Sequence, residues 1–232
     1  MIYAYEVNLD TKSDVAKSMI DDSNETQTVF IVDDDQAIRY AMGLLMQSVG
    51  LNYEIFETAN EFLEKMPEDR PGCLVLDIRM PGLGGLELQE KLAARGSTLP
   101  IIFITGHGDV PMAVEAMQKG AIDFIQKPFR DQELLDCIGN AMQTDRSRRS
   151  NLDYLTDIGD RLRKLTKRER EVLELVVTGK PNKIIAYELE VSQRTVEIHR
   201  ARVMEKMETR SLAELVRIHL SYVNHKSAPL AE

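Results

Sequence analysis

Short apolar runs alternate with stretches of helical periodicity in the first part of the chain. The runs VFIV, YEIF, CLVLD, IIFIT and IDFIQ predict strands at residues 29–32, 53–56, 73–77, 101–105 and 122–126. The stretches between and after them have the spacing of amphipathic helices, at residues 36–49, 58–65, 84–95, 109–119 and 131–143. Strands that alternate with helices of this length predict a doubly wound α/β fold with five parallel strands.

The pattern changes after residue 143, where no further strand is expected. Residues 144–164 stay helical but turn polar, with the basic cluster RSRR at 146–149, and they predict a helical linker. Helices are then expected at 167–178, 183–190, 193–208 and 212–223. Thr166 with Glu169 forms a capping box, and Ser192 is placed to cap the third of these helices. The second part of the chain is therefore predicted to be an all-α domain of four helices.

The length of 232 residues fits two domains. The predicted divisions are a mobile N-terminal extension (1–27), an α/β domain (28–143), a helical linker (144–164), an all-α domain (165–225) and a C-terminal tail (226–232).

Charge is distributed unevenly between these parts. The net charge is −9, but residues 165–232 carry 12 Lys and Arg against 10 Asp and Glu, which leaves −11 for the rest. An acidic first part and a mildly basic second part suggest two different tasks. No apolar run approaches the ~20 residues that cross a bilayer, and no secretory signal begins the chain. We expect a cytoplasmic protein that does not enter a membrane, with two reduced, buried cysteines, Cys73 and Cys137.

Carboxylates stand where two of the predicted strands end. Asp33 and Asp34 follow the first strand, and Asp77 closes the third. Ligands of open parallel sheets bind beyond the carboxyl ends of strands, so these side chains are expected to converge. Such an oxygen-rich cluster suits Mg²⁺. The alternative is that the triplet Asp33–Asp35 serves helix capping alone, a role that we expect in any case for Asp35.

The other strand ends supply complementary groups, a hydroxyl from Thr105 and an ammonium from Lys127. A carboxylate nucleophile, a metal ion, a hydroxyl and a lysine together can hold a phosphoryl group as an aspartyl phosphate.

The stretches TVFIVDDD, CLVLDIRMPGLGG and IIFITGHGDVPMAVEAMQKGAIDFIQKPF resemble the receiver domain of bacterial response regulators, most of all the FixJ branch. The resemblance covers about residues 28–141. It implies a flavodoxin-like receiver with strand order 2-1-3-4-5 and Asp77 as the phosphoacceptor. It also implies a Mg²⁺ site, a pair of switch residues and a cis Lys127–Pro128 bond. The implied metal ligands are Asp33 (through water), Asp34, Asp77 and the carbonyl of Arg79, and the switch residues are Thr105 and Phe124.

The second part predicts a helix-turn-helix, whose second helix enters the major groove of DNA. Ile184, Ile185 and Leu189 are expected on one apolar face of the first helix. Val196 and Val203 are expected to face inward from the second helix. The exposed side of that helix is predicted to be basic, with Arg194, Arg200, Arg202 and Lys206. A solvated basic face on a four-helix interaction domain remains the alternative at this point.

Residues 165–221 resemble the LuxR/NarL-type DNA-binding domain, through LTKREREVL, GKPNKIIA and TVEIH. The resemblance implies base-facing positions and phosphate contacts in and before the second helix, and dimer contacts through Leu212, Leu215, Val216 and His219 of the last helix. The candidate DNA-binding residues are Lys183, Arg194, Thr195, Glu197, Ile198, His199, Arg200, Ala201 and Arg202. Glu197 stands where many relatives have Lys, which predicts a different base preference, such as a cytosine amino group.

The two resemblances together predict a phosphorylation-dependent transcriptional response regulator that is not an enzyme. The implied partners are a sensor histidine kinase, double-stranded DNA, RNA polymerase and, after phosphorylation, a second copy of the chain. Two other functions are weighed against it. One is a Mg²⁺-dependent phosphohydrolase, which would need a second Asp where Arg79 stands, and the other is a signalling module whose tail binds protein or RNA.

Overall fold

The computed structural model describes residues 26–66, 69–106 and 110–227. The chain forms two compact units, divided between Arg148 and Arg149, and each is described by itself. Of the N-terminal extension that was expected to be mobile (1–27), all but Thr26 and Gln27 lies outside the described residues.

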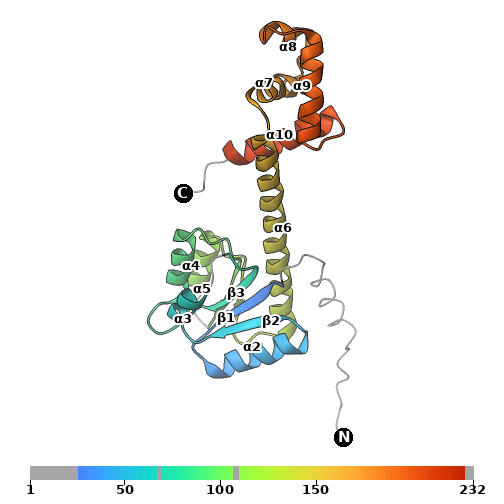
Figure 1. Ribbon diagram of the computed structural model, residues 1–232. Coiled ribbons are helices and arrows are strands. Elements are labelled where there is room, and N and C mark those ends of the chain that lie inside the picture. The colour runs from blue at the N-terminus through green and yellow to red at the C-terminus, as the bar shows by residue number, and fades with distance from the viewer. Residues whose placement is uncertain (1–25, 67–68, 107–109, 228–232) are drawn as a thin grey trace. The chain divides into compact units, whose positions relative to one another are not determined.

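The first unit is a five-stranded parallel sheet in the order β2-β1-β3-β4-β5, which confirms the expected topology (Figure 1). Its strands are β1 (Thr28–Val32), β2 (Asn52–Phe56), β3 (Gly72–Asp77), β4 (Ile101–Thr105) and β5 (Asp123–Gln126). Its helices are α2 (Gln36–Ser48), α3 (Ala59–Lys65), α4 (Gly85–Ala94), α5 (Val110–Gln118) and the first part of α6 (Asp131–Arg163).

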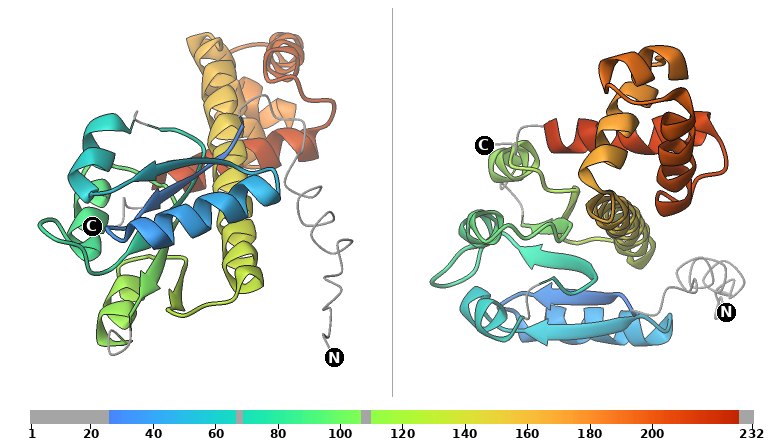
Figure 2. Two further views of the ribbon diagram at one scale, coloured as in Figure 1. Left: turned by 90° about the horizontal axis from the view of Figure 1, so that it is seen from below. Right: turned by 45° about the horizontal axis from the view of Figure 1, so that its top comes forward.

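Helices cover both faces of this sheet, as the apolar strands require. Alternate residues of β1, such as Val29 and Ile31, pack in a core with α2 and α6. The intervening residues Phe30 and Val32 pack in a second core with α3, α4 and α5. Figure 2 shows α2, in blue, running along β1 and β2. The strands β1, β3 and β4 are buried on both sides and form the centre of the sheet. Because β1 pairs with β3, the carboxyl ends of these two strands lie side by side.

The segment predicted as a linker (144–164) continues α6 without a break and contributes to the packing of both units. In the first unit, the buried Asp145 carboxylate accepts hydrogen bonds from the Gly72 N–H (2.8 Å) and the Gln27 amide (3.1 Å). Gln27 also donates to the Met142 carbonyl at 2.9 Å. In the second unit, Leu155 and Ile158 belong to the buried core.

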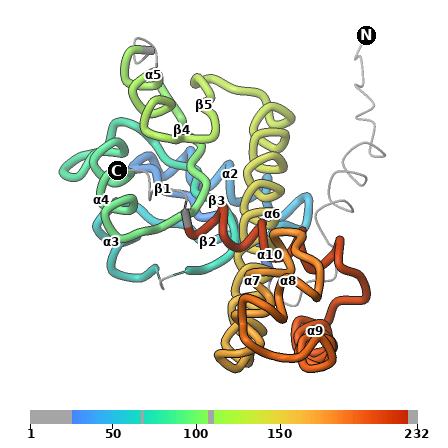
Figure 3. The backbone as a smooth tube through the Cα atoms, turned by 90° about the horizontal axis from the view of Figure 1, so that it is seen from above, coloured from blue at the N-terminus to red at the C-terminus, as the bar shows by residue number. Residues whose placement is uncertain are grey.

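The second unit consists of the last part of α6 and the helices α7 (Lys167–Val177), α8 (Asn182–Glu188), α9 (Gln193–Lys206) and α10 (Leu212–Ser227). The helices α7, α8 and α9 pack on one another, and α10 packs on α7 (Figure 3). Thr166 and Glu169 cap α7 reciprocally, as predicted. Among the residues that the structure describes, no helix has both the length and the apolar character to cross a membrane.

Candidate functional site

Three carboxylates meet at the carboxyl end of the sheet. Asp33 follows β1 and is fully buried, and Asp77 ends β3 and is 7% exposed. Asp34 is exposed to solvent. One carboxylate oxygen of each lies within 4.8 Å of the others. The strand ends therefore bring together the three side chains that the sequence singles out, and they form an all-oxygen donor set of the kind that Mg²⁺ prefers.

A lysine lies between the two buried carboxylates. Lys127 Nζ is 2.8 Å from Asp33 Oδ2 and 2.9 Å from Asp77 Oδ2. The Lys127 N–H donates to the Thr105 carbonyl at 2.7 Å, which extends the pairing of β5 with β4 and holds the lysine at the end of the sheet. Burial lowers the pKa of Lys127, but the hydrogen bonds to Asp33 and Asp77 outweigh it and raise that pKa above its usual value. The lysine is therefore a fixed positive charge at neutral pH.

For Asp77, unlike Lys127, the surroundings disfavour the charged form of the side chain. Burial raises the pKa of the Asp77 carboxyl above its usual value, the negative charge of Asp33 adds to this, and the hydrogen bond from Lys127 opposes it. Desolvation makes the carboxylate form of Asp77 costly. A cation placed beside it would reduce this cost.

The triplet of aspartates divides into separate roles. Asp35 caps α2, since its carboxylate accepts from the Ala37 N–H at 2.8 Å, as predicted. Asp33 Oδ1 accepts from the Asp35 N–H at 2.8 Å, so the buried carboxylate also orders the turn. Arg39 donates to the Asp33 carbonyl at 2.7 Å. This hydrogen bond from Arg39 was not expected from the sequence, because nothing in the pattern distinguishes an arginine in the first turn of a helix.

The two candidate switch residues differ in exposure. Thr105 is buried, and its hydroxyl lies 3.5 Å from the Ile125 carbonyl of β5. The Phe124 side chain is 38% exposed on the neighbouring strand. The Arg79 N–H lies 3.3 Å from Asp77 Oδ1, so the backbone just after β3 contacts the central carboxylate.

In the second unit, α8 and α9 are joined by a four-residue turn. The Glu190 backbone has φ of +54°, and the Val191 N–H donates to the Ala186 carbonyl. Ser192 Oγ caps α9 by accepting from the Thr195 N–H at 3.0 Å, as predicted. Val196 and Val203 are buried, as predicted. The predicted helix-turn-helix is thus formed.

The candidate DNA-binding residues fall into two groups. Six are exposed, and three are half-buried and in part engaged within the unit. Arg200 donates to the Asn182 side chain at 2.7 Å, and the Thr195 and Ser192 hydroxyls lie 2.8 Å apart. The exposed six are Lys183, Arg194, Glu197, Ile198, Ala201 and Arg202, and the half-buried three are Thr195, His199 and Arg200.

Two expectations for this unit were wrong. Lys206 is not part of a free basic face, because its ammonium binds the buried carboxylate of Glu169 at 2.6 Å. Ile184 does not join the apolar face with Ile185, because its side chain is exposed. In α10, Leu215 and His219 are buried within the unit, while Leu212 is exposed and Val216 is half-buried, so a dimer contact through this helix stays a prediction.

A parallel sheet with an acidic cluster and a lysine at its carboxyl edge, followed by a helix-turn-helix unit, defines a response regulator with a DNA-binding output domain. The family described as "Response regulator receiver domain" matches residues 29–139, and "Bacterial regulatory proteins, luxR family" matches residues 163–219. The chain belongs to the FixJ-type transcriptional response regulators, which combine these two domains.

Individual relatives agree with this assignment. The transcriptional regulatory protein FixJ of Rhizobium meliloti is 46% identical over 84% of this chain and 95% of its own length. The response regulator protein TodT of Pseudomonas putida is 43% identical over 84% of this chain and 86% of its own length. Among solved structures, the response regulator StyR is 45% identical with a TM-score of 0.78, covering 85% of this chain and 100% of that one.

Proposed function

We propose that Asp77 accepts a phosphoryl group from a phosphohistidine of a sensor kinase. The observation that carries this proposal is the contact of Lys127 with both Asp33 and Asp77 in a cluster of three carboxylates. An oxygen of Asp77 attacks the phosphorus, the bond from phosphorus to the histidine nitrogen breaks, and the imidazole leaves with the bonding electron pair. Lys127 is placed to neutralise charge on the transferring oxygens.

The residues of this cluster fit a bound Mg²⁺, which supplies positive charge against the phosphoryl oxygens when present. We assign Asp34, Asp77 and the carbonyl oxygen of Arg79 as its direct ligands and Asp33 as a ligand through water. This assignment is supported by the close approach of the three carboxylates and by the exposure of Asp34, which leaves room for water on the metal.

Phosphorylation is proposed to act through Thr105 and Phe124. The Thr105 hydroxyl donates a long hydrogen bond to the Ile125 carbonyl, at 3.5 Å, and a charged phosphoryl oxygen would offer a stronger acceptor. Phe124 is proposed to turn inward as Thr105 moves. These changes would remodel the exposed surface around Val114, Met117 and Phe124.

The output is proposed to be phosphorylation-dependent dimerisation and binding of double-stranded DNA by α9. Two α9 helices held in one dimer bind paired DNA half-sites more tightly than one helix alone, by avidity. The exposed Arg194 and Arg202 are proposed to bind phosphates, while Glu197, Ile198 and Ala201 face base edges. RNA polymerase is the proposed downstream partner and the cytoplasm the proposed location.

Phosphorylation is tested with a small-molecule acyl phosphate donor and Mg²⁺. We expect one hydroxylamine-sensitive phosphoryl group per chain, which Asp77→Asn abolishes. The matched control is Asp35→Asn, because Asn caps helices as well as Asp does and the site stays intact. Label that persists in Asp77→Asn would contradict the assignment.

DNA binding is tested by selecting bound fragments from random duplexes with the full chain, before and after phosphorylation. We expect an enriched two-fold sequence and tighter binding by the phosphorylated chain. Absence of duplex binding even at low salt, where phosphate contacts are strongest, would favour a tail that binds protein or RNA.

A phosphohydrolase is the second candidate and is disfavoured. Arg79 stands two residues after Asp77, where such an enzyme needs a carboxylate to act as general acid. We propose that the chain is not an enzyme, so the phosphoryl group should be retained for minutes or longer rather than turned over many times. Repeated turnover of phosphodonor per chain would reverse this choice.

A further inference from the structure

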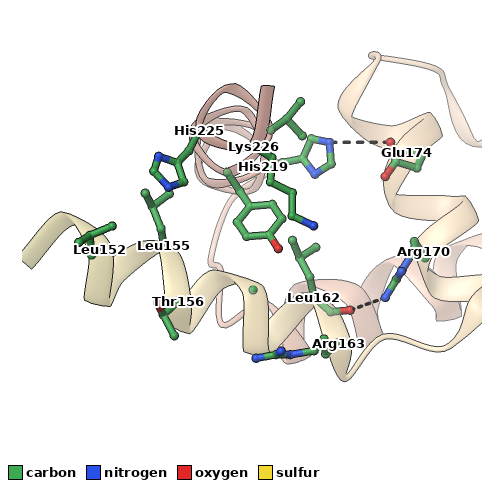
Figure 4. A pocket seen from close by; sticks show the side chains of 13 residues that line it. Leu152, Leu155, Thr156, Leu162, Arg163, Arg170, Glu174, His219, His225 and Lys226 are labelled. Atoms are coloured by element: carbon green, nitrogen blue, oxygen red, sulfur yellow. Dashed lines mark hydrogen bonds and ion pairs between the residues drawn. The ribbon is translucent and has the colours of Figure 1, made fainter. Parts of the chain in front are cut away.

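A cavity of about 670 Å³ lies within the second unit, between the last part of α6, α7 and α10 (Figure 4). Small-molecule sites typically measure ~300–1,000 Å³, so the volume is sufficient for an organic ligand of moderate size. None of the candidate DNA-binding residues lines it.

Much of the cavity wall is apolar. Leu152, Leu155 and Leu162 of α6 face Val223 of α10. The Tyr222 ring packs over Gly159, where an added β-carbon would meet the ring at 3.2 Å. Together these side chains offer an aromatic and aliphatic surface to a ligand body.

The polar part of the wall has an excess of positive charge. Among the described residues that line the cavity, Arg163, Arg170 and Lys226 are cations, and Glu174 supplies the one carboxylate. Arg163 is paired with Asp160. Arg170 donates to the Leu162 carbonyl, and Lys226 lies 5.5 Å from the centre of the Tyr222 ring. Among the described residues, neither Arg170 nor Lys226 has a carboxylate partner.

His219 provides a second, independent sign of a missing ligand. Its side chain lines the cavity and is only 7% exposed, and Nε2 lies 3.8 Å from Glu174. Its Nδ1 is buried and has no hydrogen-bond partner among the residues that the structure describes. In Figure 4 this nitrogen faces away from Glu174, toward the side of the Lys226 ammonium. A buried polar atom without a partner is costly, and with the proton on Nδ1 a ligand acceptor would satisfy it.

We propose that this cavity binds a small organic anion with an aromatic or aliphatic body. The body would lie against the leucines and Tyr222, and the anionic group, a carboxylate or a phosphate, would accept hydrogen bonds from His219 Nδ1 and lie near Lys226 and Arg170. Occupancy would stabilise the packing of α6 on α10, giving the output unit an input that is separate from Asp77.

The test uses the full chain and three probes. Anilinonaphthalene sulfonate has an aromatic body and an anionic group, phenylnaphthylamine has a similar body without charge, and inorganic phosphate has the charge alone. We expect saturable binding of one sulfonate per chain and binding of the neutral probe that is weaker by roughly tenfold, the difference that a charge-assisted hydrogen bond supplies. Phosphate alone is expected not to compete at equal concentration.

Variants locate the binding. Thr156→Trp fills the cavity from α6 and should abolish binding, while Thr156→Ser should preserve it. Lys226→Met should weaken sulfonate binding several-fold without affecting the neutral probe. Arg217→Met is the matched control, an exposed cation of α10 outside the cavity, and should change neither. Circular dichroism checks that each variant is folded.

Two further outcomes would overturn the proposal. One is sulfonate binding that does not saturate, survives Thr156→Trp or is matched by the neutral probe. The other is binding that appears only after residues 228–232 are deleted, which would make the chain's own C-terminal segment the occupant. Binding that saturates in the intact chain and follows the variants as described supports it.

Discussion

Gly85 lies directly against the backbone of Asp77. A β-carbon on Gly85 would be 2.4 Å from the Asp77 carbonyl oxygen and 3.0 Å from the Ile78 α-carbon, and the Gly85 N–H donates to the Ile78 carbonyl at 3.0 Å. Only glycine fits at this distance, so the start of α4 is seated on the end of β3. The last glycine of the stretch CLVLDIRMPGLGG, Gly85, therefore has a physical explanation in the position of the phosphoacceptor candidate.

Gly85→Ala is expected to displace the start of α4 and the Asp77 backbone. Overpacking of this kind costs about 1–3 kcal/mol, measured as the change in free energy of unfolding in urea. The extent of Asp77 labelling by the acyl phosphate donor should also fall, because the Asp77 backbone is displaced. Gly84→Ala is the control, because its added β-carbon has its nearest neighbour, the Ile78 carbonyl, at 3.6 Å. Equal effects of the two variants would contradict the proposed contact.

The divided roles of the aspartate triplet predict opposite effects of two neighbouring substitutions. Asp35→Ala should cost about 1 kcal/mol of stability through loss of the cap on α2, while labelling of Asp77 continues. Asp34→Ala should leave stability within about 0.5 kcal/mol, because its side chain is exposed, and should abolish Mg²⁺-dependent labelling. Urea titration and phosphodonor labelling of both variants check this, and a common loss of labelling would disprove the division.

The sheet and its site could be predicted because their signals are local. Continuous apolar runs mark the buried strands, and the chemistry stands at the strand ends, where parallel topology brings it together. Asp33, Asp77 and Lys127 met as expected for this reason.

Contacts that depend on packing between distant segments could not be predicted. Lys206 looks like one more cation on a basic helix, and only the packing of α9 on α7 reveals that Glu169 is its partner. Asp145 lies in a polar stretch that reads as linker, yet it is buried against Gly72 and Gln27. Ile184 and Ile185 are equally apolar, and the orientation of α8 on its neighbours determines which of the two side chains is buried.

The Glu169–Lys206 pair predicts a pH-dependent contribution to stability. Burial by itself raises the pKa of Glu169, but the hydrogen bonds from Lys206 and Thr166 outweigh it and hold that pKa below its usual value of about 4.5. A lowered pKa in the folded state means that the stabilisation is complete above the usual value and is lost as the pH falls through the folded-state pKa.

Glu169→Gln should therefore lower stability at pH 7 by about 2 kcal/mol, and the deficit should shrink once the pH falls below about 4.5. Hydrogen exchange of α7 and α9 amides in the full chain measures this locally. Glu171→Gln on the same helix, whose pair with Arg168 is more exposed, should show a deficit below about 1 kcal/mol at every pH. A deficit for Glu169→Gln that does not vary with pH would rule out the ionic pair as its source.

Two cations of α9 are expected to behave differently on DNA. Arg194 is exposed in the first turn, so Arg194→Ala should weaken binding to all duplexes and reduce the slope of log affinity against log salt by about 1. The Lys206 ammonium is held by Glu169 and the Lys164 carbonyl, so Lys206→Met should lower the stability of the second unit and leave the salt slope unchanged. Fluorescence anisotropy across a range of salt concentrations separates the two. A reduced slope for Lys206→Met would mean that this lysine exchanges Glu169 for a phosphate when the protein binds DNA.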